Sequence, residues 1–246
     1  LYSSVGFGGG STYLALLLIW GIPYFIFPVV ALSCNIIVVS GNCFNYIRAG
    51  NLNLKLLLPY LIGSIPFAYI LTKLFGFGDV RNIGSGNVGA TNVLRTGKKK
   101  LAFLVLFFDI LKGFIPLIVL KNYLFTNSSE LIVCAIASLT ILGHIFPIWL
   151  KFKGGKGVAT YIGYIFAINY IFGLIFIFAW LFIALIKKYS SLASIVSLII
   201  LPLSLYVMQF NKDINLLLLF ISIIILIKHY SNILRLFNKT ESKIKF

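Results

Sequence analysis

The chain has 246 residues, of which 60% are hydrophobic and 11% are charged, and its mean hydropathy is +1.04. Soluble domains are about 45–50% apolar and about 25% charged, so this composition excludes a water-soluble globule, a disordered chain and a disulfide scaffold, and indicates an integral membrane protein. The 21 basic residues outnumber five acidic ones but lie between apolar runs, which is not the pattern of a nucleic-acid-binding patch.

Residues 1–55 are expected to form an additional membrane segment of one or two apolar helices. This part begins with a glycine-rich run, and its apolar stretches are interrupted at Gly21, Pro23 and Pro28. Glycine and proline interrupt helices, so the number of spans in this segment is left open.

From residue 56 onward, the apolar runs predict seven membrane spans, since a spanning helix needs about 20 apolar residues. The predicted spans are 56–76, 101–121, 130–150, 157–170, 171–187, 191–210 and 214–230, and the fourth is the shortest. Alternate connections place fifteen basic residues on one side and two on the other. Because cytoplasmic loops are enriched in Lys and Arg, an all-α multi-pass protein with a cytoplasmic C-terminus is expected.

A glycine-rich polar loop follows the first of these spans. Closely spaced glycines let backbone amides turn toward a ligand, and an arginine can bind a phosphate with two hydrogen bonds. The alternative is a turn that only caps the next helix. The candidate binding residues of this loop are Gly84, Ser85, Gly86, Asn87, Thr91, Asn92 and Arg95.

A second glycine-rich loop, with three lysines, follows the third span. Its Gly-Gly-Lys-Gly sequence opens an apolar helix, where amides, helix dipole and lysine all favour an anion. It is not a Walker A motif, because Gly157 stands where Ser or Thr would hold magnesium. The alternative is a loop whose lysines only reflect the enrichment of Lys and Arg in cytoplasmic loops. Two loops of this kind on one membrane face favour a phosphate site. Its candidate residues are Gly154, Gly155, Lys156, Gly157 and Thr160.

The last span ends in a third polar cluster. His229 and Asn232 are three residues apart and therefore share a helix face, where they either contact a ligand or only satisfy backbone carbonyls. His144, at the end of another span, is expected to be structural. Asp109 and Lys112 lie three apart within a span, and we expect them to neutralise each other inside the bundle.

Covalent catalysis has little support in this sequence. There is no Ser–His–Asp set, no carboxylate pair and no metal-binding motif, and Cys34, Cys43 and Cys134 lie in apolar sequence, as buried reduced thiols do. The loops instead suit a transfer between two phosphorylated substrates that amides and cations hold in place, without a metal or cofactor.

The motifs resemble the PlsY family, the acyl-phosphate:glycerol-3-phosphate acyltransferases of bacterial inner membranes, over about residues 61–241. The resemblance implies a seven-helix enzyme that passes a fatty acyl group from acyl phosphate to the 1-hydroxyl of glycerol 3-phosphate, giving lysophosphatidic acid and phosphate for phospholipid biosynthesis. It rests on Gly63 to Phe67, Gly84 to Asn92 with Arg95, Asp109 to Gly113, Gly143 to Thr160, and His229, Asn232 and Arg235.

By matching motif, the resemblance implies catalytic roles for five residues. Ser85 and Arg95 would bind phosphate, and the 154–157 loop with Lys156 would hold the other phosphate. His229 and Asn232 would orient the acceptor. The family is thought to need no protein base, because a substrate phosphate assists.

The resemblance also sets expectations for the surroundings of the site. It implies a cytoplasmic active site in the inner membrane, acyl phosphate, glycerol 3-phosphate and the lipid bilayer as partners, no nucleic acid, and a monomer. One departure is Lys239, where the family usually has glycine. We expect this change to affect the terminal loop, in which Glu241 is expected to be structural.

The first 60 residues instead resemble a fragment of a TauE/SafE-type anion permease, on Gly6 to Gly10, Cys34-Asn35 and Gly50 to Pro59. We therefore predict a permease-like segment over 1–55 and an acyltransferase core over 56–246, joined as a chimera across Tyr60 to Phe67. The alternative function is an anion permease whose basic loops form a gate. A carrier places polar groups at mid-membrane between broken helices, whereas here they gather at one face, which favours the enzyme.

Overall fold

The computed structural model describes residues 54–244 and, before them, positions 19, 21, 23, 40–42, 44–45 and 48–50. Contacts divide the chain into two compact units, Leu1–Leu54 and Lys55–Phe246. The expected N-terminal helices fall largely outside the described residues, as do Cys34 and Cys43. The following description concerns the second unit.

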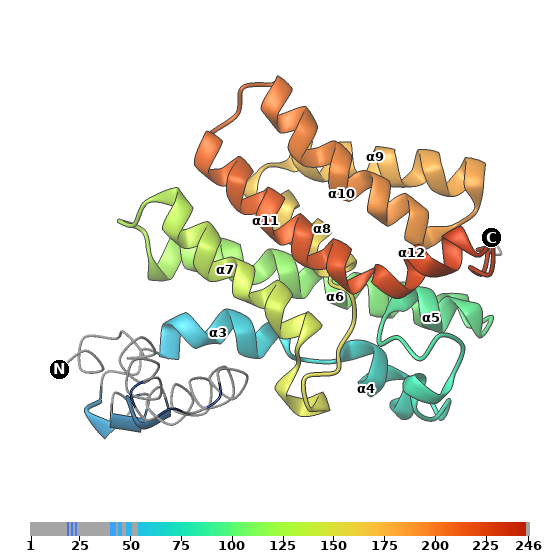
Figure 1. The fold of residues 1–246 in the computed structure, drawn as a ribbon, viewed down its shortest axis with the longest axis horizontal. Coiled ribbons are helices and arrows are strands. Elements are labelled where there is room, and N and C mark those ends of the chain that lie inside the picture. The colour runs from blue at the N-terminus through green and yellow to red at the C-terminus, as the bar shows by residue number, and fades with distance from the viewer. Residues whose placement is uncertain are drawn as a thin grey trace. The chain divides into compact units, whose positions relative to one another are not determined.

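Helices form all of the regular secondary structure over residues 54–244 (Figure 1). The α-helices are α3 (Leu54–Gly63), α4 (Phe67–Leu74), α5 (Ala90–Arg95), α6 (Lys99–Val119), α7 (Glu130–Ile145), α8 (Val158–Ile168), α9 (Tyr170–Lys187), α10 (Ser190–Val207), α11 (Lys212–Lys228) and α12 (Tyr230–Phe237). Three short turns of helix are η3 (Val80–Asn82), the π-helical η4 (Leu120–Leu124) and η5 (Ile148–Leu150).

Polar side chains mark where several of these helices begin. The Ser129 hydroxyl accepts a hydrogen bond from the Ile132 amide at the start of α7. Asn169 caps α9 and Asn211 caps α11 in the same way. Such side chains satisfy amides that have no partner within the helix, so they fix the ends of the apolar runs.

Four helices over residues 54–244 are long and apolar enough to cross a membrane singly: Lys99–Leu124, Glu130–Leu150, Tyr170–Lys187 and Ser190–Val207. Two further pairs qualify as one bent span each: α3 with α4, bent by 50°, and α11 with α12, bent by 59°. The predicted span 157–170 corresponds to α8, which has 11 residues. At about 16 Å, α8 is shorter than the hydrocarbon layer is thick, and it is the seventh apolar helix.

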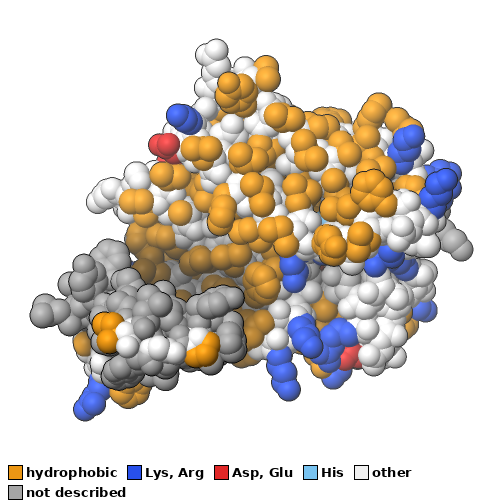
Figure 2. Space-filling view, viewed as in Figure 1, with side chains coloured by type: hydrophobic (Ala, Val, Ile, Leu, Met, Phe, Trp, Pro, Cys, Tyr) orange, Lys and Arg blue, Asp and Glu red, His pale blue; other side chains and the backbone are white. Residues whose placement is uncertain are grey.

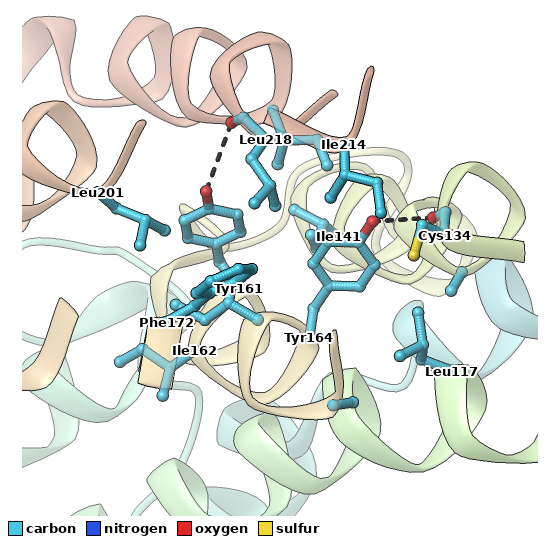
Figure 3. Packing of buried hydrophobic residues seen from close by; sticks show 14 of the residues in the cluster. Leu117, Cys134, Ile141, Tyr161, Ile162, Tyr164, Phe172, Leu201, Ile214 and Leu218 are labelled. Atoms are coloured by element: carbon cyan, nitrogen blue, oxygen red, sulfur yellow. Dashed lines mark hydrogen bonds between the residues drawn. The ribbon is translucent and has the colours of Figure 1, made fainter. Parts of the chain in front are cut away.

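The core is built around α8. Its Tyr161 and Tyr164 are fully buried with Phe172 and Phe176 of α9. The Tyr164 hydroxyl donates to the Cys134 carbonyl oxygen at 2.9 Å, and the Tyr161 hydroxyl points toward α11 (Figure 3). Cys134 is a buried free thiol, as expected. The buried tyrosines thus have hydrogen-bonding partners and tie α8 to α7 and α11.

Glycines let α6 and α8 approach closely. A Cβ atom at Gly113 would overlap the Thr160 carbonyl, and one at Gly163 would overlap the Ile110 carbonyl. This helix pair has the most extensive contact in the described part of the chain. The approach places the start of α8, with the loop before it, beside the middle of α6.

The surface of this unit is largely apolar. Phe103, Phe178, Phe182, Leu185 and Ile227 are all exposed. Figure 2 shows hydrophobic side chains spread over the upper and middle parts of the viewed face, with most Lys and Arg side chains at its right-hand end and in its lower central part. An apolar belt with basic margins is what a lipid-embedded helix bundle presents.

Candidate functional site

A cavity of about 290 Å³ brings together the three polar clusters that the sequence separates. Its polar lining comes from the loop before α5, from α5, from the loop before α8, from the first turns of α10 and from the C-terminal segment, together with Asp109 and His144. Helices α6, α8 and α9 supply apolar lining. The predicted site residues that line it are Ser85, Asn87, Thr91, Asn92, Arg95, Lys156, Gly157, His229 and Asn232.

A chain of hydrogen bonds crosses one wall of the cavity. The Lys156 ammonium donates to Asn232 Oδ1, and Asn232 Nδ2 donates to Glu241 Oε1 at 2.9 Å. Because an ammonium only donates and a carboxylate only accepts, the two ends fix the orientation of the Asn232 amide. Asn232 therefore links the loop cation to the C-terminal carboxylate.

The Glu241 carboxylate is the common partner of side chains from three elements. It accepts from Arg235 Nε at 2.7 Å, from Ser191 Oγ at 3.0 Å and from Arg95 at 3.4 Å. Although burial acts to raise it, the pKa of Glu241 is lowered by hydrogen bonds from Arg235, Asn232 and Ser191. The residue expected to be structural thus also lines the cavity and binds three of its polar side chains, Arg95, Ser191 and Asn232.

The departure at Lys239 falls where the backbone favours glycine. Its φ is 56°, in the left-handed region that residues with a Cβ adopt at some cost. The turn is nevertheless closed, since the Lys239 amide donates to the Leu236 carbonyl and the Thr240 amide to the Arg235 carbonyl. Glu241 reaches the cavity from this turn.

Lys156 lies in a partly buried, positively charged setting. Burial lowers the pKa of its ammonium to about 8, against the opposing effect of the Glu241 carboxylate. The charges of Arg235 and Arg95 act in the same direction as burial. A site with these cations close together favours an anionic ligand, which would relieve their mutual repulsion.

His229 is fixed at the bend between α11 and α12. Its Nδ1 lies 2.8 Å from the Ile225 carbonyl oxygen, and the ring is buried. A carbonyl can only accept, so Nδ1 carries the proton of the neutral ring and Nε2 is free to accept one hydrogen bond. The histidine can therefore orient a hydroxyl group.

Asn92 holds the first loop in shape. Its Oδ1 accepts from the Ser85 amide at 2.8 Å, and its Nδ2 donates to the carbonyls of Val80 at 3.0 Å and Ile83 at 2.8 Å. These bonds use both ends of the side chain. Asn92 therefore positions Ser85, and its predicted direct contact with a ligand stays a prediction.

The second loop is less open than expected. The Gly154 amide donates to the Ile145 carbonyl at 3.2 Å, and the Gly155 amide donates to the His144 carbonyl at 3.1 Å. Both donors are used by the end of α7, which leaves Lys156 and Gly157 as the part of the loop that lines the main cavity. Sequence spacing alone could not distinguish free amides from bonded ones.

Five predicted binding residues lie off the main cavity. Gly154 and Gly155 line a small pocket behind it, and Gly84 lines a neighbouring hollow. Thr160 is buried against Gly113, and the Gly86 amide donates to the Ile83 carbonyl. The structure thus brings nine of the fourteen predicted residues to one cavity.

The pair within α6 is present as predicted. Lys112 Nζ lies 2.8 Å from Asp109 Oδ1, and both side chains are almost fully buried. His144 Nδ1 is 3.6 Å from the same oxygen, and Lys112 also donates to the Ile65 carbonyl at 2.8 Å. Asp109 and His144 reach the cavity wall, so this cluster supports the site from behind.

Four cavity residues with polar groups, Trp180, Ser190, Ser191 and Ser194, were not singled out from the sequence. Ser190 lies 3.3 Å from the Thr91 hydroxyl, Ser191 binds Glu241, and the indole of Trp180 donates to Ser194 at 3.1 Å. Two serines at the start of an apolar helix, after a basic loop, are a recognisable signal for an anion site. The tryptophan carries no such signal.

Comparison with known sequences places residues 53–239 in one family. A family model described as glycerol-3-phosphate acyltransferase matches residues 53–239. The glycerol-3-phosphate acyltransferase of Pelagibacter ubique is 48% identical over 191 residues, which cover 76% of this chain and 94% of that protein. That of Bartonella quintana is 46% identical over 188 residues, covering 76% of this chain and 89% of that protein.

Solved structures show the same relationship. The crystal structure of PlsY, an integral membrane glycerol 3-phosphate acyltransferase, in its glycerol 3-phosphate form matches with a TM-score of 0.72 at 40% identity, covering 78% of this chain and 94% of that chain. Its lysophosphatidic acid form matches with a TM-score of 0.70 at 38% identity, over 77% and 93%.

Proposed function

This chain belongs to the glycerol-3-phosphate acyltransferase family, and on that premise we propose that it transfers a fatty acyl group from an acyl phosphate to the 1-hydroxyl of glycerol 3-phosphate. The family, with relatives at this identity, favours the acyltransferase over the anion permease as the function of the core. The observation that carries the finer proposal is the joining of two cationic loops and His229 at one cavity with apolar lining.

The apolar lining suits the acyl chain of the donor. Leu106 of α6 and Leu181 of α9 line the cavity and are also exposed at the surface. A chain lying along them would extend from the bilayer into the site. We assign the donor phosphate to Lys156 and Gly157, where an ammonium and the start of α8 both stabilise negative charge.

The acceptor is assigned to the other polar residues of the cavity. Arg95 and Ser85 would bind the phosphate of glycerol 3-phosphate, and Asn232 and His229 would orient its hydroxyl groups. With Nδ1 bound to Ile225, His229 would offer Nε2 as the acceptor of the 1-hydroxyl hydrogen. Holding both reactants in this geometry is the main source of rate.

The proposed step needs no protein nucleophile. The 1-hydroxyl oxygen attacks the acyl carbonyl carbon, the bond from that carbon to the phosphate oxygen breaks, and the hydroxyl proton goes to the departing phosphate. Lysophosphatidic acid and inorganic phosphate are the products. Lys156 would stabilise the negative charge that develops during the attack.

The assay that tests this proposal uses the full-length protein in detergent with palmitoyl phosphate. Phosphate release that depends on glycerol 3-phosphate, with lysophosphatidic acid formed, is the expected result. Palmitoyl-coenzyme A in place of palmitoyl phosphate should give no product. Formation of lysophosphatidic acid with palmitoyl-coenzyme A but not with palmitoyl phosphate would overturn the assignment of acyl phosphate as the donor.

Replacing His229 by glutamine should lower kcat/KM for glycerol 3-phosphate about tenfold, since one well-oriented hydrogen bond to the reacting hydroxyl is weakened. Steady-state kinetics with saturating palmitoyl phosphate measure the effect. Tyr230→Phe, at the adjacent exposed position, is the matched control and should retain the wild-type value. A His229→Gln enzyme with full kcat/KM would remove the histidine from the proposed site.

Activity should decline on the alkaline side because of Lys156. The free enzyme binds phosphate with the charged ammonium, whose pKa is about 8, so kcat/KM should fall as the pH rises above about 8. An arginine stays charged throughout this range, so Lys156→Arg should retain a flat profile even if its rate is lower. A wild-type kcat/KM that stays constant to pH 10 would contradict this role.

We also propose an inner-membrane location with the cavity facing the cytoplasm, and residues 1–55 as a separate permease-like segment. The two loops and the C-terminal segment line one cavity, and they belong to the connections with fifteen of the basic residues. The contact boundary after Leu54 is consistent with a distinct first segment. Labelling of a cysteine introduced at Lys243 in sealed cells tests the orientation, and accessibility from outside would reverse it.

A further inference from the structure

A second basic hollow lies apart from the proposed catalytic cavity. It encloses about 800 Å³ and shares no lining residue with that cavity. Its walls come from the break between α3 and α4, from α4, from η3 and from η5 with the loop after it. We call it the interfacial groove, and its lining residues are Ile65, Pro66, Tyr69, Ile70, Arg81, Trp149, Leu150, Lys151 and Lys153.

The charge of the interfacial groove is positive. Lys151 and Lys153 are exposed, and neither has a carboxylate partner in the part of the chain that the structure describes. Arg81 is held by Asp79 at 2.6 Å and lies 5.1 Å from the centre of the Tyr69 ring. No acidic residue lines the groove, so its rim is suited to an anion.

The other half of the lining is apolar and exposed. Trp149 is 63% exposed and Ile70 is 43% exposed. Both belong to a protein whose helices are long and apolar enough to cross a bilayer. Tryptophan and lysine side by side are typical of the zone where a bilayer meets water, since the indole lies among headgroups and the ammonium reaches the phosphates.

Backbone hydrogen bonds close the turn that carries the two lysines. The amides of Leu150 and Phe152 both donate to the Pro147 carbonyl, at 3.2 and 2.9 Å, and the Lys153 amide donates to the Leu150 carbonyl at 3.1 Å. A preformed turn loses little conformational freedom on binding, which favours a defined site over diffuse attraction.

From this combination we propose that the interfacial groove binds one anionic phospholipid of the surrounding membrane. Its headgroup phosphate lies against Lys151 and Lys153, and its acyl chain lies along Trp149 and Ile70. The bound lipid is a structural ligand of the chain, separate from the substrates of the acyl transfer. A free phosphate ion would use the same cations but none of the apolar wall.

Native mass spectrometry of the full-length protein titrated with phosphatidylglycerol tests this proposal, with phosphatidylcholine as the uncharged comparison. The double variant Lys151→Gln with Lys153→Gln should bind phosphatidylglycerol at least about tenfold more weakly than wild type. Lys187→Gln with Lys188→Gln removes the same charge from another exposed loop and is the matched control. It should bind as wild type does.

Equally weaker phosphatidylglycerol binding in both double variants would indicate diffuse electrostatic attraction and would overturn the proposed site. Unchanged binding in both double variants would overturn it as well. Phosphatidylglycerol with brominated acyl chains gives a second measurement. It should quench tryptophan fluorescence in wild type, and the quenched part should be the part that the Trp149→Phe variant lacks. Displacement of the lipid by millimolar inorganic phosphate would point to a free anion instead. The acyltransferase rate with saturating substrates in detergent should be the same in wild type and both double variants.

Discussion

Lys156→Ala should lower turnover with palmitoyl phosphate and glycerol 3-phosphate roughly ten- to hundredfold, because in the proposed reaction it would remove a charge-assisted hydrogen bond worth about 1.5–3 kcal/mol at the reacting phosphate. The change also frees Asn232, whose Oδ1 otherwise accepts from the Lys156 ammonium. We therefore expect the Michaelis constant for glycerol 3-phosphate to rise together with the loss of turnover. Initial rates of lysophosphatidic acid formation measure both quantities.

Lys153→Ala is the matched control for this prediction. It removes the same charge three residues away, from a side chain that is exposed and does not line the catalytic cavity. Its initial rates should equal those of wild type. If the Lys156 variant were as active as this control, Lys156 would have no part in binding or stabilising the phosphate.

Asp109→Ala is expected to reduce the free energy of unfolding by about 3–5 kcal/mol, since it leaves the Lys112 ammonium buried without its counter-ion. Lys112 is 3% exposed and would keep its hydrogen bond to the Ile65 carbonyl and its contact with the Phe67 ring, neither of which supplies a negative charge. The same change deprives His144 of its acidic neighbour. Thermal unfolding in detergent should show a large downward shift of the midpoint.

The double variant Asp109→Leu with Lys112→Met distinguishes charge imbalance from poor packing. Replacing both charges by apolar groups of similar size removes the unpaired ion, so much of the lost stability should return. Lys121→Ala is the comparison at an exposed ion pair, with Glu130 at 3.1 Å, and should cost less than about 1 kcal/mol. If the unfolding midpoint fell no further in Asp109→Ala than in Lys121→Ala, the result would contradict a stabilising buried ion pair.

The apolar runs predicted most of the helices. The runs at 101–121 and 171–187 correspond to α6 (Lys99–Val119) and α9 (Tyr170–Lys187). These helices were predictable because their signal is local: a continuous apolar stretch of spanning length between polar residues. The family resemblance was equally local, since each motif lies within one short segment, and it is confirmed over the core.

Breaks within spans were harder to predict. The run 56–76 is two helices bent by 50°, because Pro66 has no amide hydrogen to continue α3. At the break, the Ile65 carbonyl accepts from Lys112. The bend of 59° that puts His229 on the cavity wall contains no proline or glycine. Its position depends on contacts with other helices, which a single run of sequence does not contain.

By itself, the sequence determined the class of the protein, its helical segments, its charge asymmetry and the three motifs that carry the family. Only the tertiary structure decided which polar groups are free to act. In the structure, the Gly154 and Gly155 amides donate to carbonyls at the end of α7. The Glu241 carboxylate accepts from Arg95, which is 146 positions away along the chain. Composition and spacing are set by neighbours along the chain, whereas hydrogen-bond partners and burial are set by neighbours in space.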